Sequence, residues 1–239
     1  MSGRWQAKWA RLLEGKAQGQ RMDAITAEAL KARHREVRDG HPESLSVRIH
    51  RAVSWLERAE QAGEDADARF VFLWIAFNAA YASEFGFEQS ERAQAREFVE
   101  RVVGLDGEGR MHRILFGQFS GPVRTLVDNR FVFEPFWRAV REHDPSERWK
   151  EQFEAERRLA LRAVMERGTA PLLATVLDRL YVLRNQIVHG GATWNSRANR
   201  AQVNDAVAIL GSLLPEMIRV MMDNPDAAFG EIAYPVIPG

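Results

Sequence analysis

Residues 180–191 read Leu180-Tyr181-Val182-Leu183-Arg184-Asn185-Gln186-Ile187-Val188-His189-Gly190-Gly191. On a helical wheel of about 100° per residue, this stretch separates into an aliphatic side and a polar side. The aliphatic stripe consists of Val176, Leu180, Leu183 and Ile187, and the opposite side carries Asp178, Tyr181, Asn185 and His189. The pattern predicts an amphipathic helix over residues 171–189 that buries its aliphatic stripe.

The polar side of this predicted helix gathers residues suited to chemistry on a phosphate. Asn185 and His189 are i,i+4 neighbours, and Arg184 flanks them. Gly190 and Gly191 are suited to end the helix in a left-handed conformation, so His189 lies at the negative end of the helix dipole, which favours its protonated form. A histidine that titrates near neutrality beside a guanidinium suits proton transfer next to a phosphate. The alternative is that Asn185 and His189 only cap the helix end.

The rest of the chain also predicts helices, and no strand alternation or hairpin signal is found. Residues 69–82 are apolar nearly all round, which predicts a helix at the centre of a bundle. Asn78 within it needs hydrogen-bond partners. It is either a structural amide or a residue that faces the polar side of the helix that carries Arg184 and His189.

Further helices are predicted at residues 45–62, 89–103, 111–116, 121–129, 131–142, 145–167 and 198–224. The last of these has a stripe of Val203, Val207, Leu210, Leu214, Met217 and Met221 and is interrupted by Pro215, which predicts a kink. Residues 1–40 are highly charged and predict a peripheral arm with helical segments at 5–13 and 23–38. Residues 41–225 form the predicted helical domain, with an insertion at about 84–144, and residues 226–239 form a loose tail.

Composition excludes several kinds of site. The chain has no Cys, which rules out disulfides, thiol nucleophiles and thiolate zinc sites, and no His-Glu-x-x-His zinc motif or Gly-rich phosphate loop is present. We therefore expect no metal and no cofactor. The sequence lacks a secretion signal and a membrane-length apolar run, so we expect a cytoplasmic protein without membrane association.

Charge points to one local region. The formal net charge is zero, so a nucleic-acid site must be local rather than spread over the surface. Residues 184–204 contain no acidic side chain, but they contain Arg184, Arg197, Arg200 and His189, and Trp194 there is able to stack on a base. A second aromatic group comprises Phe131, Phe133, Phe136 and Trp137. It is most simply part of the core, and a platform for bases is the alternative.

Two blocks resemble the HEPN superfamily, and together they resemble its Apea-like bacterial branch. The first block is residues 72–81, Phe-Leu-Trp-Ile-Ala-Phe-Asn-Ala-Ala-Tyr, and the second is residues 183–190, which match the family pattern of Arg, a polar residue, three variable positions and His. The likeness covers residues 45–83 and 145–222. It implies an all-α, antiparallel helical bundle with extra helices inserted between the second and third core helices. It also implies a homodimer in which two such motifs meet at a cleft.

The resemblance also implies an activity. Many members are metal-independent endoribonucleases of toxin–antitoxin and phage-defence systems, in which the ribose 2′-OH attacks the adjacent phosphate and leaves 2′,3′-cyclic phosphate and 5′-OH ends. Carried over to this chain, His189 acts as general acid or base, Arg184 holds the phosphate and Asn185 orients either group. Trp194, Arg197, Arg200, Asn78 and Tyr181 are the expected RNA-binding residues. The alternative is a non-catalytic module that binds RNA or protein, such as an antitoxin or another defence-system partner.

Overall fold

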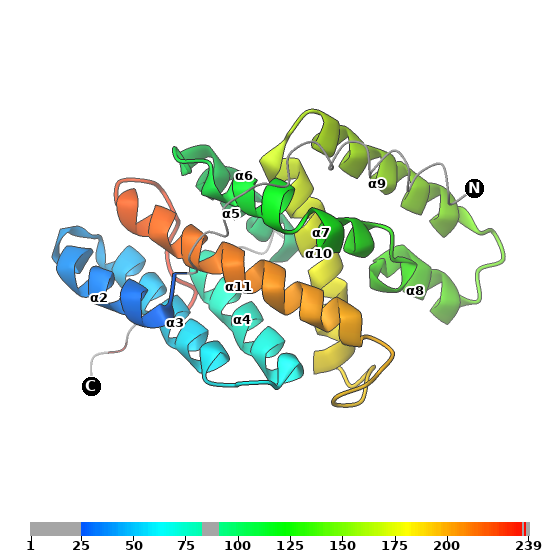
Figure 1. Ribbon diagram of the computed structural model, residues 1–239, viewed down its shortest axis with the longest axis horizontal. Helices are drawn as coiled ribbons and strands as arrows, with labels where there is room; N and C mark the ends of the chain where they lie inside the picture. Colours follow the sequence, from blue (N-terminus) through cyan, green and yellow to red (C-terminus); the bar gives the residue numbers. More distant parts are fainter. Residues whose placement is uncertain (1–24, 83–90, 236, 238–239) are drawn as a thin grey trace. The chain divides into compact units, whose positions relative to one another are not determined.

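The computed structural model describes residues 25–82, 91–235 and 237, and within these residues the regular secondary structure is helical (Figure 1). The prediction of an all-α protein is confirmed for this part of the chain. Among the helices described, none is both long enough and apolar enough to span a lipid bilayer.

The chain divides into two compact units. The motif unit contains residues 112–205, and the flanking unit contains the described residues of 22–111 together with those that follow residue 205. The main helices of the flanking unit are α2 (Ala27–Val37), α3 (Glu43–Glu60), α4 (Ala66–Tyr81), α5 (Glu91–Leu105) and most of α11 (Arg200–Asp223). Those of the motif unit are α7 (Ser120–Val127), α8 (Glu134–Glu142), α9 (Arg148–Met165) and α10 (Thr169–Val188). Short elements complete the pattern: η1 (Arg38–Gly40), α6 (Arg110–Arg113), η2 (Ile114–Gln118) and η3 (Arg130–Val132).

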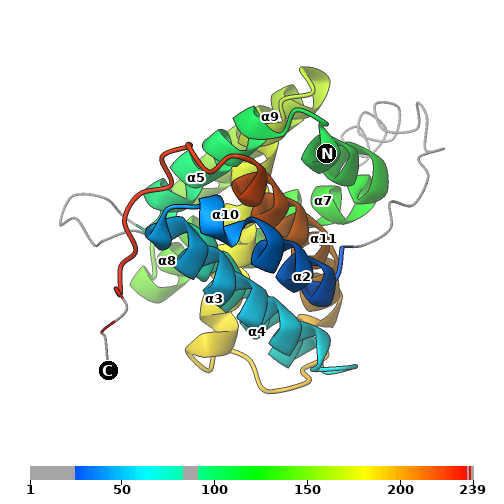
Figure 2. The same cartoon turned by 90° about the vertical axis from the view of Figure 1, so that its left-hand side faces the viewer.

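Helix α4 forms the centre of the flanking unit, as its apolar sequence predicts. Its side chains Phe70 and Phe77 are fully buried, and α3 packs along it (Figures 1 and 2). Asp65 begins α4, because its carboxylate accepts a hydrogen bond from the Ala68 N–H at 3.0 Å. Gly211 of α11 faces the same helix, where a Cβ would lie 3.8 Å from Leu73 Cδ1.

Arg48 of α3 is a buried cation that joins two distant segments of the flanking unit. Its guanidinium donates to the carbonyls of Ala80, Ala82, Gly230 and Glu231 at 3.1, 2.7, 3.2 and 3.1 Å. Burial lowers the pKa of Arg48 to about 10. These bonds hold residues 230–231 against the end of α4. The preceding residue, Phe229, is buried. This part of the predicted loose tail is therefore packed.

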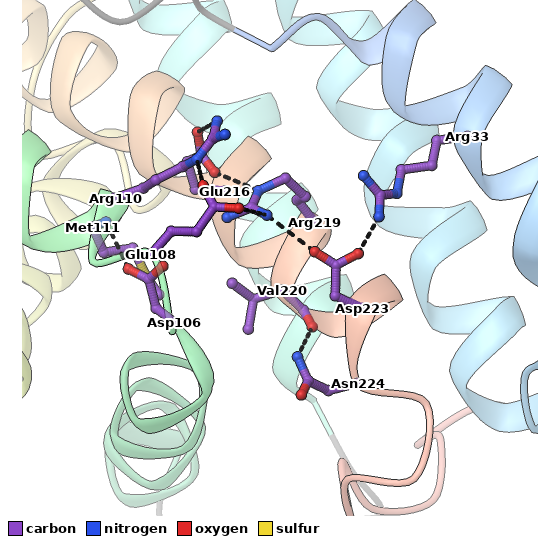
Figure 3. A network of polar contacts seen from close by, with 10 residues as sticks. All are labelled: Arg33, Asp106, Glu108, Arg110, Met111, Glu216, Arg219, Val220, Asp223 and Asn224. Atoms are coloured by element: carbon purple, nitrogen blue, oxygen red, sulfur yellow. Dashed lines mark hydrogen bonds and ion pairs between the residues drawn. The ribbon is translucent and has the colours of Figure 1, made fainter.

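A polar network fastens α11 within the flanking unit (Figure 3). At its centre is Glu216, which is 3 % exposed and pairs with Arg219 at 2.8 Å and with Arg110 at 3.4 Å. Arg219 also reaches Asp223 at 3.0 Å, and Asp223 pairs with Arg33 of α2. The network thus connects α2, α6 and α11 through side chains that are distant in sequence.

Helix α2 differs from the predicted peripheral arm. Ala27 and Leu30 are buried and α2 packs on α3, so residues 27–37 belong to the flanking unit. The predicted segment at 5–13 lies outside the described residues. Pro42 precedes α3, and Ser46 in the first turn of this helix contacts the His34 ring of α2 at 3.1 Å.

In the motif unit, α10 packs against α7, α9 and η3. Its residues Leu172, Leu173, Val176, Leu180 and Leu183 are buried. Arg179 lies on the buried side as well, with its guanidinium carbon 4.6 Å from the Phe133 ring centre and 5.6 Å from that of Phe153. Glu156 of α9 pairs with it at 3.1 Å. Ring faces and one carboxylate thus accommodate a cation that a simple amphipathic pattern would place at the surface.

Candidate functional site

The carboxyl-terminal half of α10 separates its residues much as the sequence predicts. Leu180 and Leu183 are buried, whereas Ile187 is only partly buried. On the polar side, Tyr181 and Asn185 are half-buried and His189 is exposed. The candidate catalytic side chains therefore lie at the border between the packed and the exposed surface of one helix.

Backbone hydrogen bonds end α10 directly after Val188. His189 is the capping residue, and its N–H donates to the Asn185 carbonyl at 3.0 Å. Gly190 follows with φ +70°, and its N–H donates to the Ile187 carbonyl at 3.2 Å. The predicted left-handed end is confirmed at Gly190. Gly191 serves a different purpose, because a Cβ there would lie 3.1 Å from the Gln186 carbonyl oxygen.

The imidazole of His189 takes no part in this helix end. Within the described part of the chain, no hydrogen bond or ion pair to the His189 ring is found. The His189 side chain is exposed at this end of the helix. The capping bonds come from main-chain N–H groups, so the interpretation of His189 as a side-chain cap has no support in the geometry.

Arg184 is held by its neighbours on α10. Its Nη1 donates to Asn185 Oδ1 at 3.0 Å, and its guanidinium carbon lies 4.8 Å from the centre of the Tyr181 ring. An amide oxygen and a ring face thus help to position this guanidinium on α10. The structure brings Arg184 into contact with Asn185 and Tyr181, which lie about one and two helical turns before His189.

The loop after α10 carries the other predicted RNA-binding residues. Trp194 is 75 % exposed, Arg197 is exposed, and Arg200 is half-buried at the start of α11. The loop returns to α10 through Asn199, whose Nδ2 donates to Gln186 Oε1 at 3.1 Å. Its basic residues therefore share the motif unit with Arg184 and His189.

Asn78 is placed elsewhere. It lies on α4 in the flanking unit, where it is half-buried, and its Oδ1 has no hydrogen-bond partner among the residues described. The structure does not group Asn78 with the residues of α10, and its part in the site stays a prediction.

Gln186 is a site residue that the sequence did not single out. Besides accepting from Asn199, it donates through Nε2 to the Phe131 carbonyl at 2.6 Å. It thereby ties the loop after α10 and the η3 turn to the motif helix. Its partners lie 13 and 55 positions away in sequence, so no local pattern indicates this role.

The electrostatics of the site follow from the residues that surround α10. No acidic side chain occurs between Arg184 and Asn204, and the next one, Asp205, is half-buried. Burial raises the pKa of the Asp205 carboxyl, because desolvation disfavours its charged form.

Only one member of the second aromatic group is core. Phe133 is buried, whereas Phe136 and Trp137 are half-buried and Phe131 is 44 % exposed. The prediction that the whole group is core is therefore wrong for Phe131, because the η3 turn directs its side chain outward while Phe133 packs on Phe153 with ring centres 5.2 Å apart.

Comparison with protein-family models, with curated proteins and with solved structures gives no significant match to this chain.

Proposed function

We propose that this protein is a metal-independent endoribonuclease that cleaves single-stranded RNA. In this proposal the ribose 2′-OH attacks the adjacent phosphate, and the P–O5′ bond breaks to leave 2′,3′-cyclic phosphate and 5′-OH ends. The observation that carries the proposal is the presence of an exposed imidazole at His189 on the same end of α10 as the Arg184 guanidinium, which Asn185 Oδ1 and the Tyr181 ring hold in place.

Each residue has a definite task in this reaction. His189 accepts the proton of the attacking 2′-OH or donates a proton to the departing 5′ oxygen, since an imidazole changes protonation state near neutral pH. Arg184 binds the phosphate and stabilises the negative charge that develops on its oxygens. Asn185 holds the Arg184 guanidinium through its side-chain oxygen at 3.0 Å. Tyr181 supports the same guanidinium from its ring face.

A homodimer completes the proposed site. The reaction needs one group to accept a proton and another to donate one, and each chain offers a single histidine in the motif. A two-fold axis between the exposed ends of two α10 helices, one from each copy, would bring two histidines and two arginines together. In the cell, an antitoxin would cover this surface, or another defence-system protein would trigger its activity. The motif resembles that of HEPN proteins of the Apea-like branch.

The test is cleavage of single-stranded RNA in buffer that contains EDTA. We expect His189→Ala and Arg184→Ala each to lower the cleavage rate by at least about 100-fold, the usual contribution of a general acid–base group or of a charge that stabilises the transition state. Thermal unfolding of His189→Ala should change little, because its ring makes no bond within the described residues. Products with 2′,3′-cyclic phosphate and 5′-OH ends would identify attack by the ribose 2′-OH.

Two matched substitutions serve as controls. His50→Ala removes an exposed histidine of α3, and Arg158→Ala removes an exposed arginine of α9. Both should cleave at the wild-type rate. Cleavage that survives in His189→Ala, or that depends on added metal, would contradict the proposal. RNA binding by the wild type without any product would favour the alternative, a non-catalytic RNA-binding module.

A further inference from the structure

An aromatic patch lies on the surface of the motif unit, beside the η3 turn. It consists of Phe131, Phe136, Trp137 and Trp149, which belong to η3, α8 and α9. Phe136 is in edge contact with the other rings, at centre distances of 5.5 Å to Phe131, 5.2 Å to Trp137 and 5.0 Å to Trp149. Phe131 is the most exposed member, at 44 %. Phe136, Trp137 and Trp149 are half-buried, so the group presents part of its ring surface to solvent.

A cation extends this patch. Arg130 is exposed, and its guanidinium carbon lies 4.9 Å from the centre of the Phe131 ring and 5.6 Å from that of Phe136. No ion pair between Arg130 and a carboxylate is found among the described residues, whereas Arg138 nearby pairs with Glu134 at 2.6 Å. A guanidinium that stacks on rings and keeps its charge offers a flat face to a base and N–H donors to a phosphate.

The patch is joined to the motif helix by one short connection. The Phe131 carbonyl accepts hydrogen bonds from Gln186 Nε2 at 2.6 Å and from Trp137 Nε1 at 2.8 Å. Gln186 lies on α10 one helical turn before His189. The bond from Gln186 holds the Phe131 backbone against α10, the helix that carries the proposed catalytic residues.

We infer that the aromatic patch with Arg130 binds unpaired bases of the RNA strand that enters the site at His189. The inference rests on the proposed function. Exposed rings bind bases of any sequence by stacking, and Arg130 adds stacking and phosphate contact, which together fit a single strand. A duplex would not fit this chemistry, because its bases are stacked on one another and hidden from side-chain rings.

The experiment measures RNA binding in a background that cannot cleave. His189→Ala protein is titrated into a fluorescent single-stranded RNA of about 12 nucleotides in EDTA buffer, a length that spans a typical single-strand site. Adding Phe131→Ala or Arg130→Gln should raise the dissociation constant by about 10-fold, the usual effect of losing one stacked base. Inorganic polyphosphate, which has no bases, should bind Phe131→Ala as tightly as it binds the parent protein.

The chain provides a matched control for these variants. Trp55 of α3 is 38 % exposed and stacks on Phe72 at 5.8 Å, and the Arg58 guanidinium lies 4.8 Å from the same Phe72 ring. Trp55→Ala therefore removes an exposed ring with a similar setting in the flanking unit. Its RNA dissociation constant should stay within about twofold of the parent value.

The outcomes separate this inference from the proposed function. Equal RNA affinity of Phe131→Ala, Arg130→Gln and Trp55→Ala would overturn the patch, even if the wild type cleaves RNA through His189. Weaker RNA binding by both patch variants would support it, even if the wild type makes no product. If Phe131→Ala and Arg130→Gln lost self-association but kept their RNA affinity, the patch would be a protein–protein interface, and the inference would be overturned. Phe131→Ala should fold normally, because its N–H and carbonyl bonds are retained.

Discussion

At the scale of single residues, buried charges hold the flanking unit together. The Glu216 side chain is 4 % exposed and lies between two arginines, whereas the Asp223 side chain, in the same network, is 28 % exposed. Both carboxylates form ion pairs, so they differ mainly in their access to water. A buried carboxylate whose partners remain charged is costly to remove, whereas a more exposed pair contributes little.

This difference yields a prediction from two equivalent substitutions. Glu216→Gln should lower the free energy of unfolding by about 2–3 kcal/mol, because Arg110 and Arg219 would lose their most buried counter-charge and keep only the more exposed Glu108 and Asp223. Asp223→Asn should lower it by less than about 1 kcal/mol. Urea denaturation of the three proteins at neutral pH measures both values. Equal losses would show that burial does not govern the strength of this network.

Such residues could not have been predicted from the sequence. Glu216, Arg48 and Arg179 are charged, and a periodic pattern assigns charged residues to the surface. Each is buried because its partners come from distant segments: the carbonyls of residues 230–231 for Arg48, and the Phe133 and Phe153 rings for Arg179. Nothing in the local sequence indicates those partners.

At the scale of elements, the sequence predicts most helices well. The apolar period of α11 places Val203, Val207, Leu210, Leu214 and Met217 on one stripe, and all of them are buried. The end of α10 is also predictable, because a glycine is the residue best suited to a left-handed conformation. The bond from Gln186 to Phe131, which positions the candidate site, could not be predicted, since it depends on how η3 packs against α10.

The helix end gives a prediction about backbone conformation alone. Gly190 has φ +70°, and Gly121 in α7 has an ordinary helical conformation, but an added Cβ would meet no atom within 4 Å at either position. Gly190→Ala should therefore lower the free energy of unfolding by about 1 kcal/mol through backbone strain, and should reduce RNA cleavage by displacing His189. Gly121→Ala should leave stability unchanged or raise it slightly.

Thermal unfolding of both variants, followed by circular dichroism, measures this effect. If Gly190→Ala were as stable as Gly121→Ala, the left-handed turn after α10 would not be the conformation of this segment in solution.

At the scale of the whole molecule, the sequence predicted the all-α class but not the division into two units. The apolar pattern of a helix predicts which of its faces is buried, but it does not predict which other helix packs on that face. The proposed homodimer also belongs to this scale, because its cleft would need one His189 from each copy.

A mixed dimer tests that requirement. Wild-type and His189→Ala chains with different tags are co-expressed in equal amounts, so that they pair at random. If each cleft needs two histidines, heterodimers are inactive and total RNA cleavage falls to about a quarter of the wild-type value, as random pairing predicts. Chains that act independently would retain about half. A value near half would contradict the shared cleft.

The contacts of Arg48 have a consequence for how the protein is made. Its partner carbonyl on Gly230 is synthesised 182 positions after this arginine. Until then the cation has no complete set of acceptors and must stay hydrated. The interior of the flanking unit therefore reaches its final packing only after residues 230–231 emerge from the ribosome.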